Sequence, residues 1–130
     1  MSSPFRWVDK QALLLLHSES LAEHGGLGGM RDEGLLDSAL ARPLNLAAYG
    51  APDLADLAAI YGVGLAKNHP FLDGNKRAAF LAVGLFLYIN GYRLKSDQAS
   101  ATHAMLAVAA GELDEAEFAA WLRAHIAPRG

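Results

Sequence analysis

The 130-residue chain contains no cysteine, which excludes disulfide bonds, a thiol nucleophile and a thiolate zinc site. Long hydrophobic segments are also absent. The most apolar run, residues 78–89, has 12 residues, whereas roughly 20 are needed to cross a bilayer. Residues 1–7 lack the basic stretch and the long apolar core of a signal peptide. We therefore expect a cytoplasmic protein that does not associate with membranes.

The chain also lacks a large excess of either positive or negative charge. Eleven Lys and Arg against 14 Asp and Glu leave a formal net charge of −3, and the longest basic cluster is Lys76-Arg77. Direct binding of DNA or RNA is not expected, because nucleic-acid-binding proteins carry a broad basic patch. Hydrophobic residues make up 52% of the chain and charged residues 19%, which excludes intrinsic disorder. This length and composition predict a single domain over residues 1–130.

Helical start and stop signals dominate the sequence. The predicted helices run from Asp9 to His24, Glu33 to Ala41, Leu54 to Asn68, about Gly74 to Asn90, Ser96 to about Gly111, and Asp114 to Ile126. Pro43 is expected to end the second helix, and Tyr92-Arg93-Leu94 to form a short extended piece. No segment sustains the two-residue alternation of a strand. The sequence therefore predicts an all-α, compact six-helix fold.

Two features outside the main motif are interpreted as structural. The glycine cluster at residues 25–29, with Gly34 beyond it, fits neither a dinucleotide-binding nor a Walker motif, so we interpret it as a turn. Four histidines are scattered along the chain and are interpreted as surface or packing residues: His17, His24, His103 and His125.

Chemistry-bearing side chains gather in residues 69–77, His-Pro-Phe-Leu-Asp-Gly-Asn-Lys-Arg. Pro70 disfavours helical backbone at the preceding residue, so we expect the third helix to end at His69 and the imidazole to be presented from a bend. A histidine imidazole is largely neutral near pH 7 and can accept a proton from a hydroxyl. A lone histidine is more often a loop or core residue, but the neighbouring charged and amide groups favour a catalytic role.

Lys76 and Arg77 lie in the first turn of the fourth predicted helix, where the helix dipole disfavours a cation by roughly 0.3–1 kcal/mol. A bound anion removes this conflict. The backbone N–H groups, the two cations and the Asn75 amide can then all point at phosphate oxygens. Gly74 lets the backbone approach such a ligand closely. The predicted phosphate site consists of Gly74, Asn75, Lys76 and Arg77.

Asp73 has two interpretations. An aspartate before a helix is most simply an N-cap. If phosphates are bound, its carboxylate also suits Mg²⁺, which binds through one or two carboxylates together with phosphate oxygens and water. Phe71 is expected to turn inward and hold the loop on the core. The apolar body of the fourth helix, Phe80 to Tyr88, is expected to be buried beneath the site.

Residues 69–77 resemble the motif of the Fic/Doc (Fido) family, His-Pro-Phe-x-Asp/Glu-Gly-Asn-Gly/Lys-Arg, at every defined position. Lys76, the segment from His24 to Leu40 and the stretch Asn90-Gly91-Tyr92 are similar to the death-on-curing branch, the toxins of type II toxin–antitoxin systems. The similarity covers nearly the whole chain.

The resemblance implies that His69 is the general base on a target-protein hydroxyl, that Asp73 is a Mg²⁺ ligand and that residues 74–77 bind the phosphates of ATP. Family members with glycine at the position of Lys76 mostly transfer AMP. The best-known death-on-curing toxin instead phosphorylates a threonine of elongation factor Tu and inhibits translation. Lysine therefore favours phosphate transfer, since a long cation crowds and neutralises phosphates differently from glycine. AMP transfer and a catalytically inactive, antitoxin-binding module are the alternatives.

The chain departs from the pattern at two positions. Lys67 stands where the characterised toxin looks to carry arginine, and Leu81 where it looks to carry asparagine. Lys67 either contacts a phosphate or the target, or is a solvated cation that complements the C-terminal helix dipole. The family's self-inhibitory helix, Ser/Thr-x-x-x-Glu-Gly/Asn, is not visible. This implies control by a separate antitoxin of the prevent-host-death kind, which folds a disordered segment onto the toxin.

Overall fold

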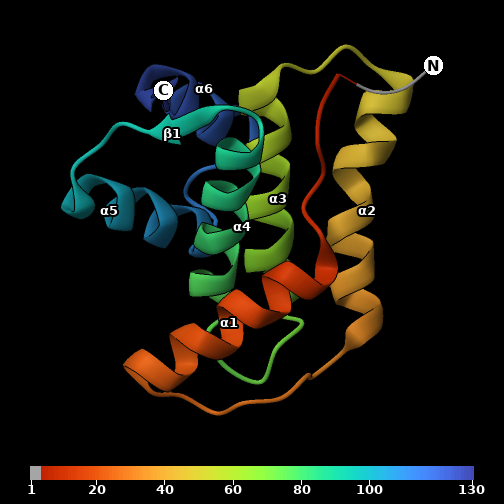
Figure 1. Ribbon diagram of the computed structural model, residues 1–130, viewed down its shortest axis with the longest axis vertical. Helices are drawn as coiled ribbons and strands as arrows, with labels where there is room; N and C mark the ends of the chain where they lie inside the picture. Colours follow the sequence, from red (N-terminus) through yellow and green to blue (C-terminus); the bar gives the residue numbers. More distant parts are fainter. Residues whose placement is uncertain (1–3) are drawn as a thin grey trace.

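The computed structural model describes residues 4–130. The expectation that residues 1–7 are not a signal peptide therefore falls partly outside the described residues. Within this range the chain forms six helices and two short strands (Figure 1), which confirms the predicted all-α fold. The elements are α1 (Lys10–His24), α2 (Glu33–Tyr49), α3 (Leu54–Asn68), α4 (Asn75–Ile89), β1 (Tyr92–Leu94), α5 (Gln98–Ala109), α6 (Glu115–His125) and β2 (Ile126–Pro128). The strand predicted at residues 92–94 is confirmed, and it pairs antiparallel with β2. None of the described helices could span a membrane.

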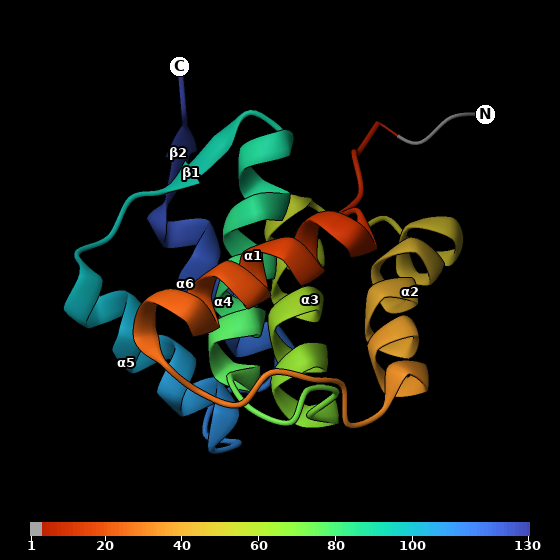
Figure 2. The ribbon, with the colours of Figure 1, turned by 60° about the horizontal axis from the view of Figure 1, so that its bottom comes forward.

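Helices α3 and α4 form the centre of the fold, with α2 beside α3 and α1 crossing in front of them (Figures 1 and 2). Apart from Asp56, every residue from Ala55 to Ala66 in α3 is buried. A Cβ atom on Gly62 would lie 2.9 Å from the Phe118 ring and 3.0 Å from a Val83 methyl, so only glycine allows α4 and α6 to pack this closely on α3. The turn that joins α3 to α4 is therefore supported by the most buried part of the molecule.

The predicted end of the second helix at Ala41 is wrong. Helix α2 continues to Tyr49, and Pro43 lies inside it and is buried. Proline removes one helical hydrogen bond and costs about 3 kcal/mol in a helix interior. Leu46 and Ala47, beyond the proline, pack against the core. The free energy gained by burying these side chains offsets the missing hydrogen bond. A prediction from the proline alone does not take this packing into account.

Two helix ends also differ from prediction. The N-cap of α5 is Asp97 and not Ser96, because the Asp97 carboxylate accepts the Ser100 N–H at 2.6 Å. The Ser96 hydroxyl donates instead to the Asp97 carbonyl. Helix α6 ends at His125, so Ile126 belongs to β2, where it pairs with Leu94.

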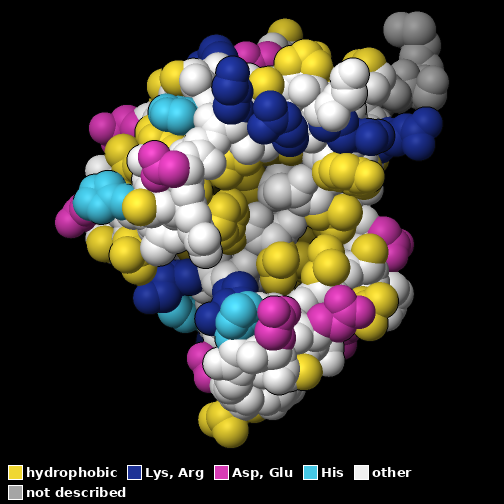
Figure 3. Space-filling model, turned by 60° about the vertical axis from the view of Figure 1, so that its left-hand side comes forward, with side chains coloured by type: hydrophobic (Ala, Val, Ile, Leu, Met, Phe, Trp, Pro, Cys, Tyr) yellow, Lys and Arg dark blue, Asp and Glu magenta, His cyan; other side chains and the backbone are white. Residues whose placement is uncertain are grey.

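One side of α4 is uncovered, so the expectation that Phe80 to Tyr88 is buried throughout is wrong. Gly84 is exposed, and Tyr88 is 57% exposed. An apolar groove of about 420 Å³ follows this side of the helix and is lined by Leu16, Arg77, Phe80, Leu81, Gly84, Leu85 and Tyr88. Figure 3 shows hydrophobic side chains in a hollow on this face, with Lys and Arg side chains at its lower edge. A helix that is apolar all round has more hydrophobic surface than its neighbours here can cover.

An ion pair at the start of α3 predicts acid sensitivity. Hydrogen bonds from the Arg123 guanidinium lower the pKa of Asp53, the N-cap of α3, from 3.8 to about 2. Because the pKa in the folded state is the lower one, the pair stabilises the fold above about pH 4, and this contribution is lost as the pH falls towards about 2. Arg123→Ala should lower the free energy of unfolding at pH 7 by no more than about 1 kcal/mol, since the pair is half exposed. Urea unfolding between pH 7 and about pH 2 should show that the free energy of unfolding falls less with decreasing pH in the variant than in the wild type. An unchanged pH dependence would contradict this assignment.

Candidate active site

The third helix ends at His69, as predicted, and the backbone there is left-handed, with φ 50° and ψ 55°. Left-handed backbone costs a residue with a side chain roughly 1–2 kcal/mol. Arg31 stabilises this bend, because its side chain donates to the His69 carbonyl at 2.5 Å and to the Asn68 carbonyl at 2.7 Å. The backbone N–H groups of Arg31 and Asp32 donate to the Pro70 carbonyl at 2.8 and 2.9 Å. The His69 side chain is exposed, so its imidazole is accessible to a substrate.

Phe71 turns inward as predicted and is 2% exposed. The Asn75 side chain, 9% exposed, holds it there. Asn75 Oδ1 accepts the Phe71 N–H at 2.9 Å, and Asn75 Nδ2 donates to the Phe71 carbonyl at 3.0 Å. This orientation differs from the expectation that the Asn75 amide points at phosphate, because both ends of the amide bind inside the loop. One Nδ2 hydrogen and the backbone N–H of Asn75 remain for a ligand.

Asn75→Ala should destabilise the protein by about 1–3 kcal/mol, because the polar backbone groups of Phe71 then lose their buried partners. Urea unfolding measures this change. Asn45→Ala, which removes an exposed amide from α2, is the matched control and should have little effect. A variant at position 75 that keeps its stability but binds ATP poorly would instead indicate that the amide contacts phosphate.

Helix α4 begins without a side-chain cap. Its N-cap residue is Gly74, with φ 74°, and no side chain accepts from the first turn. Every other helix in residues 4–130 begins with an aspartate that accepts a backbone N–H: Asp9, Asp32, Asp53, Asp97 and Asp114. Lys76 and Arg77 are exposed in this open first turn, and neither takes part in an ion pair among the described residues. Free N–H groups and two unpaired cations together favour an anion.

Asp73 is not the N-cap of α4, so the capping interpretation is wrong. Its Oδ2 accepts the Leu27 N–H at 3.1 Å, and its Oδ1 accepts the Gly74 N–H at 2.8 Å. These backbone hydrogen bonds, followed by the positive charge of Arg77, lower the pKa of the Asp73 carboxyl. The exposed carboxylate is therefore ionised near pH 7 and retains lone pairs for a cation.

Asp73 is the carboxylate that could serve as a Mg²⁺ ligand in this loop. Residues 4–130 contain no group of three or more His, Asp or Glu side chains that could hold a metal ion. A single carboxylate suits Mg²⁺ when phosphate oxygens and water supply the other ligands. Asp73 therefore fits Mg²⁺ that binds together with a nucleotide, and it does not form a metal centre of the protein alone.

These groups share one pocket of about 920 Å³, which is within the usual size range of small-molecule sites. One wall contains His69, Asp73 and residues 74–77, and the other comes from α5, including Thr102 and Met105. Among the predicted site residues in the described part of the chain, Lys67 alone does not line the pocket. It is exposed in the last turn of α3, where it complements the helix dipole.

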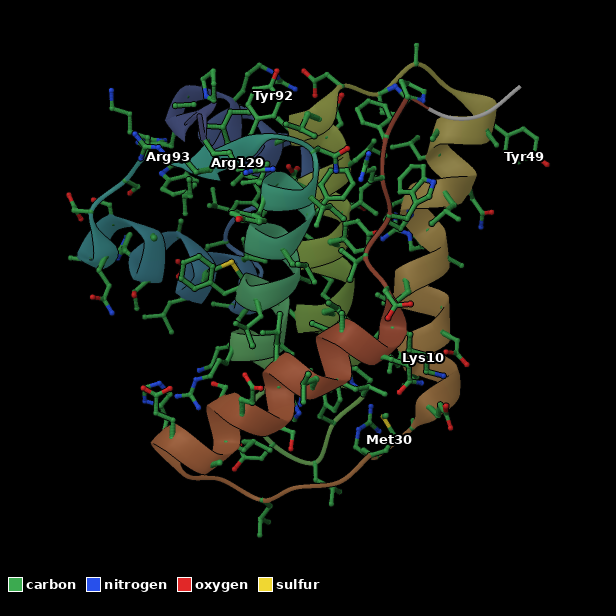
Figure 4. All side chains as sticks on the ribbon, viewed as in Figure 1. Lys10, Met30, Tyr49, Tyr92, Arg93 and Arg129 are labelled. Carbon is green, nitrogen blue, oxygen red and sulfur yellow. The ribbon has the colours of Figure 1, made fainter. Side chains whose placement is uncertain are left out.

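The glycine cluster at residues 25–29 was interpreted as a turn, but the segment that contains it, residues 25–32, runs beside the motif loop. Met30 pairs with Phe71 in an isolated antiparallel bridge, and the Gly29 carbonyl accepts the Leu72 N–H at 3.1 Å. Figure 4 shows Met30 below α1, at the end of the molecule that holds this loop. A Cβ atom on Gly26 would lie 2.9 Å from Asp73 Oδ2, so glycine permits this contact. In the sequence, the glycine cluster was the one feature that could have indicated this close approach of two backbone segments.

His17 and Arg31 also contribute to the site, and the sequence did not indicate either role. His17 is buried beneath the loop, which confirms that it is a packing residue. Arg31 holds the end of α3 from a residue 38 positions away in the sequence. An isolated arginine or histidine far from the motif carries no spacing signal that links it to the site.

Comparison with known proteins gives three findings. A model of the Fic/DOC family matches residues 7–87, which include the whole motif. The chain is 43% identical over 94 residues to Toxin Doc of Mycolicibacterium smegmatis, an alignment that covers 70% of this chain and 69% of that protein. It is 33% identical over 119 residues to Protein kinase doc of Escherichia phage P1, with 91% of this chain and 94% of that protein covered.

Proposed function

This chain belongs to the Fic/DOC family, and from that premise we propose that it is a death-on-curing toxin that transfers the γ-phosphate of ATP to a serine or threonine hydroxyl of a target protein. The observation that carries the proposal is the open start of α4, where Lys76 and Arg77 lie in the same pocket as His69. A base for a hydroxyl and a site for phosphates are the two parts that phosphoryl transfer needs.

In the proposed reaction, the His69 imidazole accepts the proton of the target hydroxyl. The hydroxyl oxygen forms a bond to the γ-phosphorus, and the bond from that phosphorus to the β,γ-bridging oxygen breaks. ADP leaves with the electron pair, and the imidazole releases its proton to solvent. Lys76, Arg77 and the free N–H groups of α4 hold the phosphates and stabilise their negative charge. Mg²⁺ held at Asp73 would neutralise further charge on the phosphate oxygens.

Two observations favour phosphate transfer over AMP transfer. Lys76 is exposed in the pocket, where its ammonium can contact the terminal phosphates. A relative that aligns over 91% of this chain is named a protein kinase. AMP transfer would instead break the bond between the α-phosphorus and the bridging oxygen, so the two reactions add different groups to the target.

Mass spectrometry separates these reactions. The purified chain is incubated with ATP, Mg²⁺ and elongation factor Tu, the candidate target, and the mass of the target is then measured. We expect the gain of one phosphate on a threonine. A gain of AMP would replace the kinase proposal with AMP transfer. If no target is modified, calorimetry shows no ATP binding and cells that express the chain grow normally, the antitoxin-binding module is the better interpretation.

We also propose that a cognate antitoxin of the prevent-host-death type controls the chain. One relative is named Toxin Doc, and the family resemblance implies a separate antitoxin that controls the toxin. The test is growth of cells that express the chain with and without a short protein encoded beside it. Growth that is arrested with the chain alone and restored by this partner supports the proposal, whereas growth that the partner leaves arrested contradicts it.

A further inference from the structure

We propose that His17, on α1, is a positioning residue that holds the Asp73–Gly74 peptide in the orientation the active site needs. This inference rests on the proposed function, because it assigns a task to His17 in the binding of Mg²⁺ and ATP. His17 lies 56 positions from Asp73 in the sequence and is outside the nine-residue motif.

His17 lies against the motif loop at three residues, Phe71, Asp73 and Gly74. Its ring stacks on Phe71 with 3.8 Å between ring centroids and 19° between planes. Its Nε2 lies 2.9 Å from the Asp73 carbonyl oxygen. A Cβ atom on Gly74 would lie 3.1 Å from the same Nε2. A carbonyl oxygen only accepts hydrogen bonds, so His17 Nε2 carries a hydrogen and donates it.

The Asp73–Gly74 peptide is consequently held at both ends. His17 donates to its carbonyl oxygen, and its N–H donates to Asp73 Oδ1 at 2.8 Å. Rotation of this peptide would break both hydrogen bonds and move the Asp73 carboxylate together with the start of α4. The His17 imidazole therefore helps to set the orientation of the cation ligand and of the first free N–H groups, together with the Leu27 N–H that binds Asp73 Oδ2.

The choice of histidine supports this role. His17 is 4% exposed, and a buried polar side chain costs free energy unless it is hydrogen-bonded. An apolar side chain of similar size would fill the same space without that cost. Helix α1 is also fixed at its start, where Lys10 Nζ lies 2.8 Å from Asp37 Oδ1 on α2 (Figure 4). His17 thus acts from a helix that is itself held in place.

The test compares two substitutions in the full-length chain. His17→Phe keeps a stacked ring and removes the donor, whereas His17→Gln restores a donor at a similar distance. His103→Phe, the same change at an exposed position of α5, is the matched control. Calorimetry measures ATP affinity with and without Mg²⁺. Hydrogen exchange by NMR measures protection of the Gly74 amide, and urea unfolding measures stability.

We expect His17→Phe to weaken the Mg²⁺-dependent part of ATP binding by about tenfold and to accelerate exchange of the Gly74 amide. Affinity for ATP without Mg²⁺ should change less, and His17→Gln should recover most of the Mg²⁺ effect. Unchanged Mg²⁺ dependence in His17→Phe would overturn the inference. The inference would also be overturned if His17→Phe and His17→Gln lost the same Mg²⁺-dependent ATP affinity in proportion to their loss of stability. His17 would then be only a packing residue.

If His17→Phe does not fold, His17→Met provides the donor-free comparison with His17→Gln. The Gly74 amide measurement needs no nucleotide. If the wild-type chain binds no ATP and modifies no hydroxyl, the proposed function fails, and the amide exchange still reports whether His17 holds the peptide.

Discussion

Replacing His69 with asparagine should lower the rate of target modification by about 10²–10⁴-fold and leave the fold intact. The asparagine amide cannot accept the hydroxyl proton. Asparagine tolerates left-handed backbone better than alanine does, and His69 has φ 50°. The His69 side chain is exposed, and the hydrogen bonds of this residue involve its backbone, so loss of the imidazole should barely change stability. Initial rates by mass spectrometry and urea unfolding measure the two effects.

His24→Asn is the matched control, because His24 is another exposed histidine that lines the same pocket. Its rate should stay near that of the wild type. His69→Ala should also abolish activity, with an additional small loss of stability from alanine in left-handed backbone. A His69→Asn variant that retains more than about a tenth of the wild-type rate would show that another group takes the proton.

Arg77→Ala should weaken ATP binding by about 10- to 100-fold, since a hydrogen bond between charged groups contributes about 1.5–3 kcal/mol. The guanidinium lies in the uncapped first turn of α4, where the free N–H groups and Lys76 also attract phosphate. Calorimetry with ATP measures the change. The loss should be smaller at high salt, because part of the attraction is screened.

Arg42→Ala provides the control for Arg77. Arg42 is a half-exposed arginine on α2 that pairs with Glu115, 2.9 Å away, and it does not line the pocket. Its removal changes the net charge by the same amount. Equal losses of affinity in both variants would indicate that only net charge matters, which would contradict a phosphate site at Arg77.

Most of the fold could be predicted because its signals are local. The starts predicted at Asp9, Glu33, Leu54 and Asp114 lie within one residue of the observed ones. At each of these starts an aspartate accepts a backbone N–H within the same turn: Asp9, Asp32, Asp53 and Asp114. The failures occurred where a distant contact outweighed a local preference. Pro43 remains helical because residues beyond it pack on the core, and α4 is partly exposed because the elements of residues 4–130 leave Gly84 uncovered.

The candidate site divides in the same way. Residues that share a turn or a helix start, such as His69 and Arg77, could be assigned to one site from their spacing, and both line the pocket. The capping role considered for Asp73 and the phosphate-facing orientation expected for the Asn75 amide differ from the structure, whereas the Mg²⁺ role of Asp73 stays a prediction. An aspartate or asparagine side chain can form hydrogen bonds with several backbone groups near it in the sequence. The folded loop decides which of these hydrogen bonds form.

The sequence by itself determined the six helices, their class of fold and the nine residues of the candidate site, because capping, apolar spacing and a contiguous motif act between neighbours in the chain. The tertiary structure alone decided how that motif is held. Arg31 and His17 reach it from 38 and 56 positions away, and such contacts depend on how α1, α3 and α4 pack together. Packing of distant segments is set by the complementarity of whole surfaces, which no short window of sequence contains.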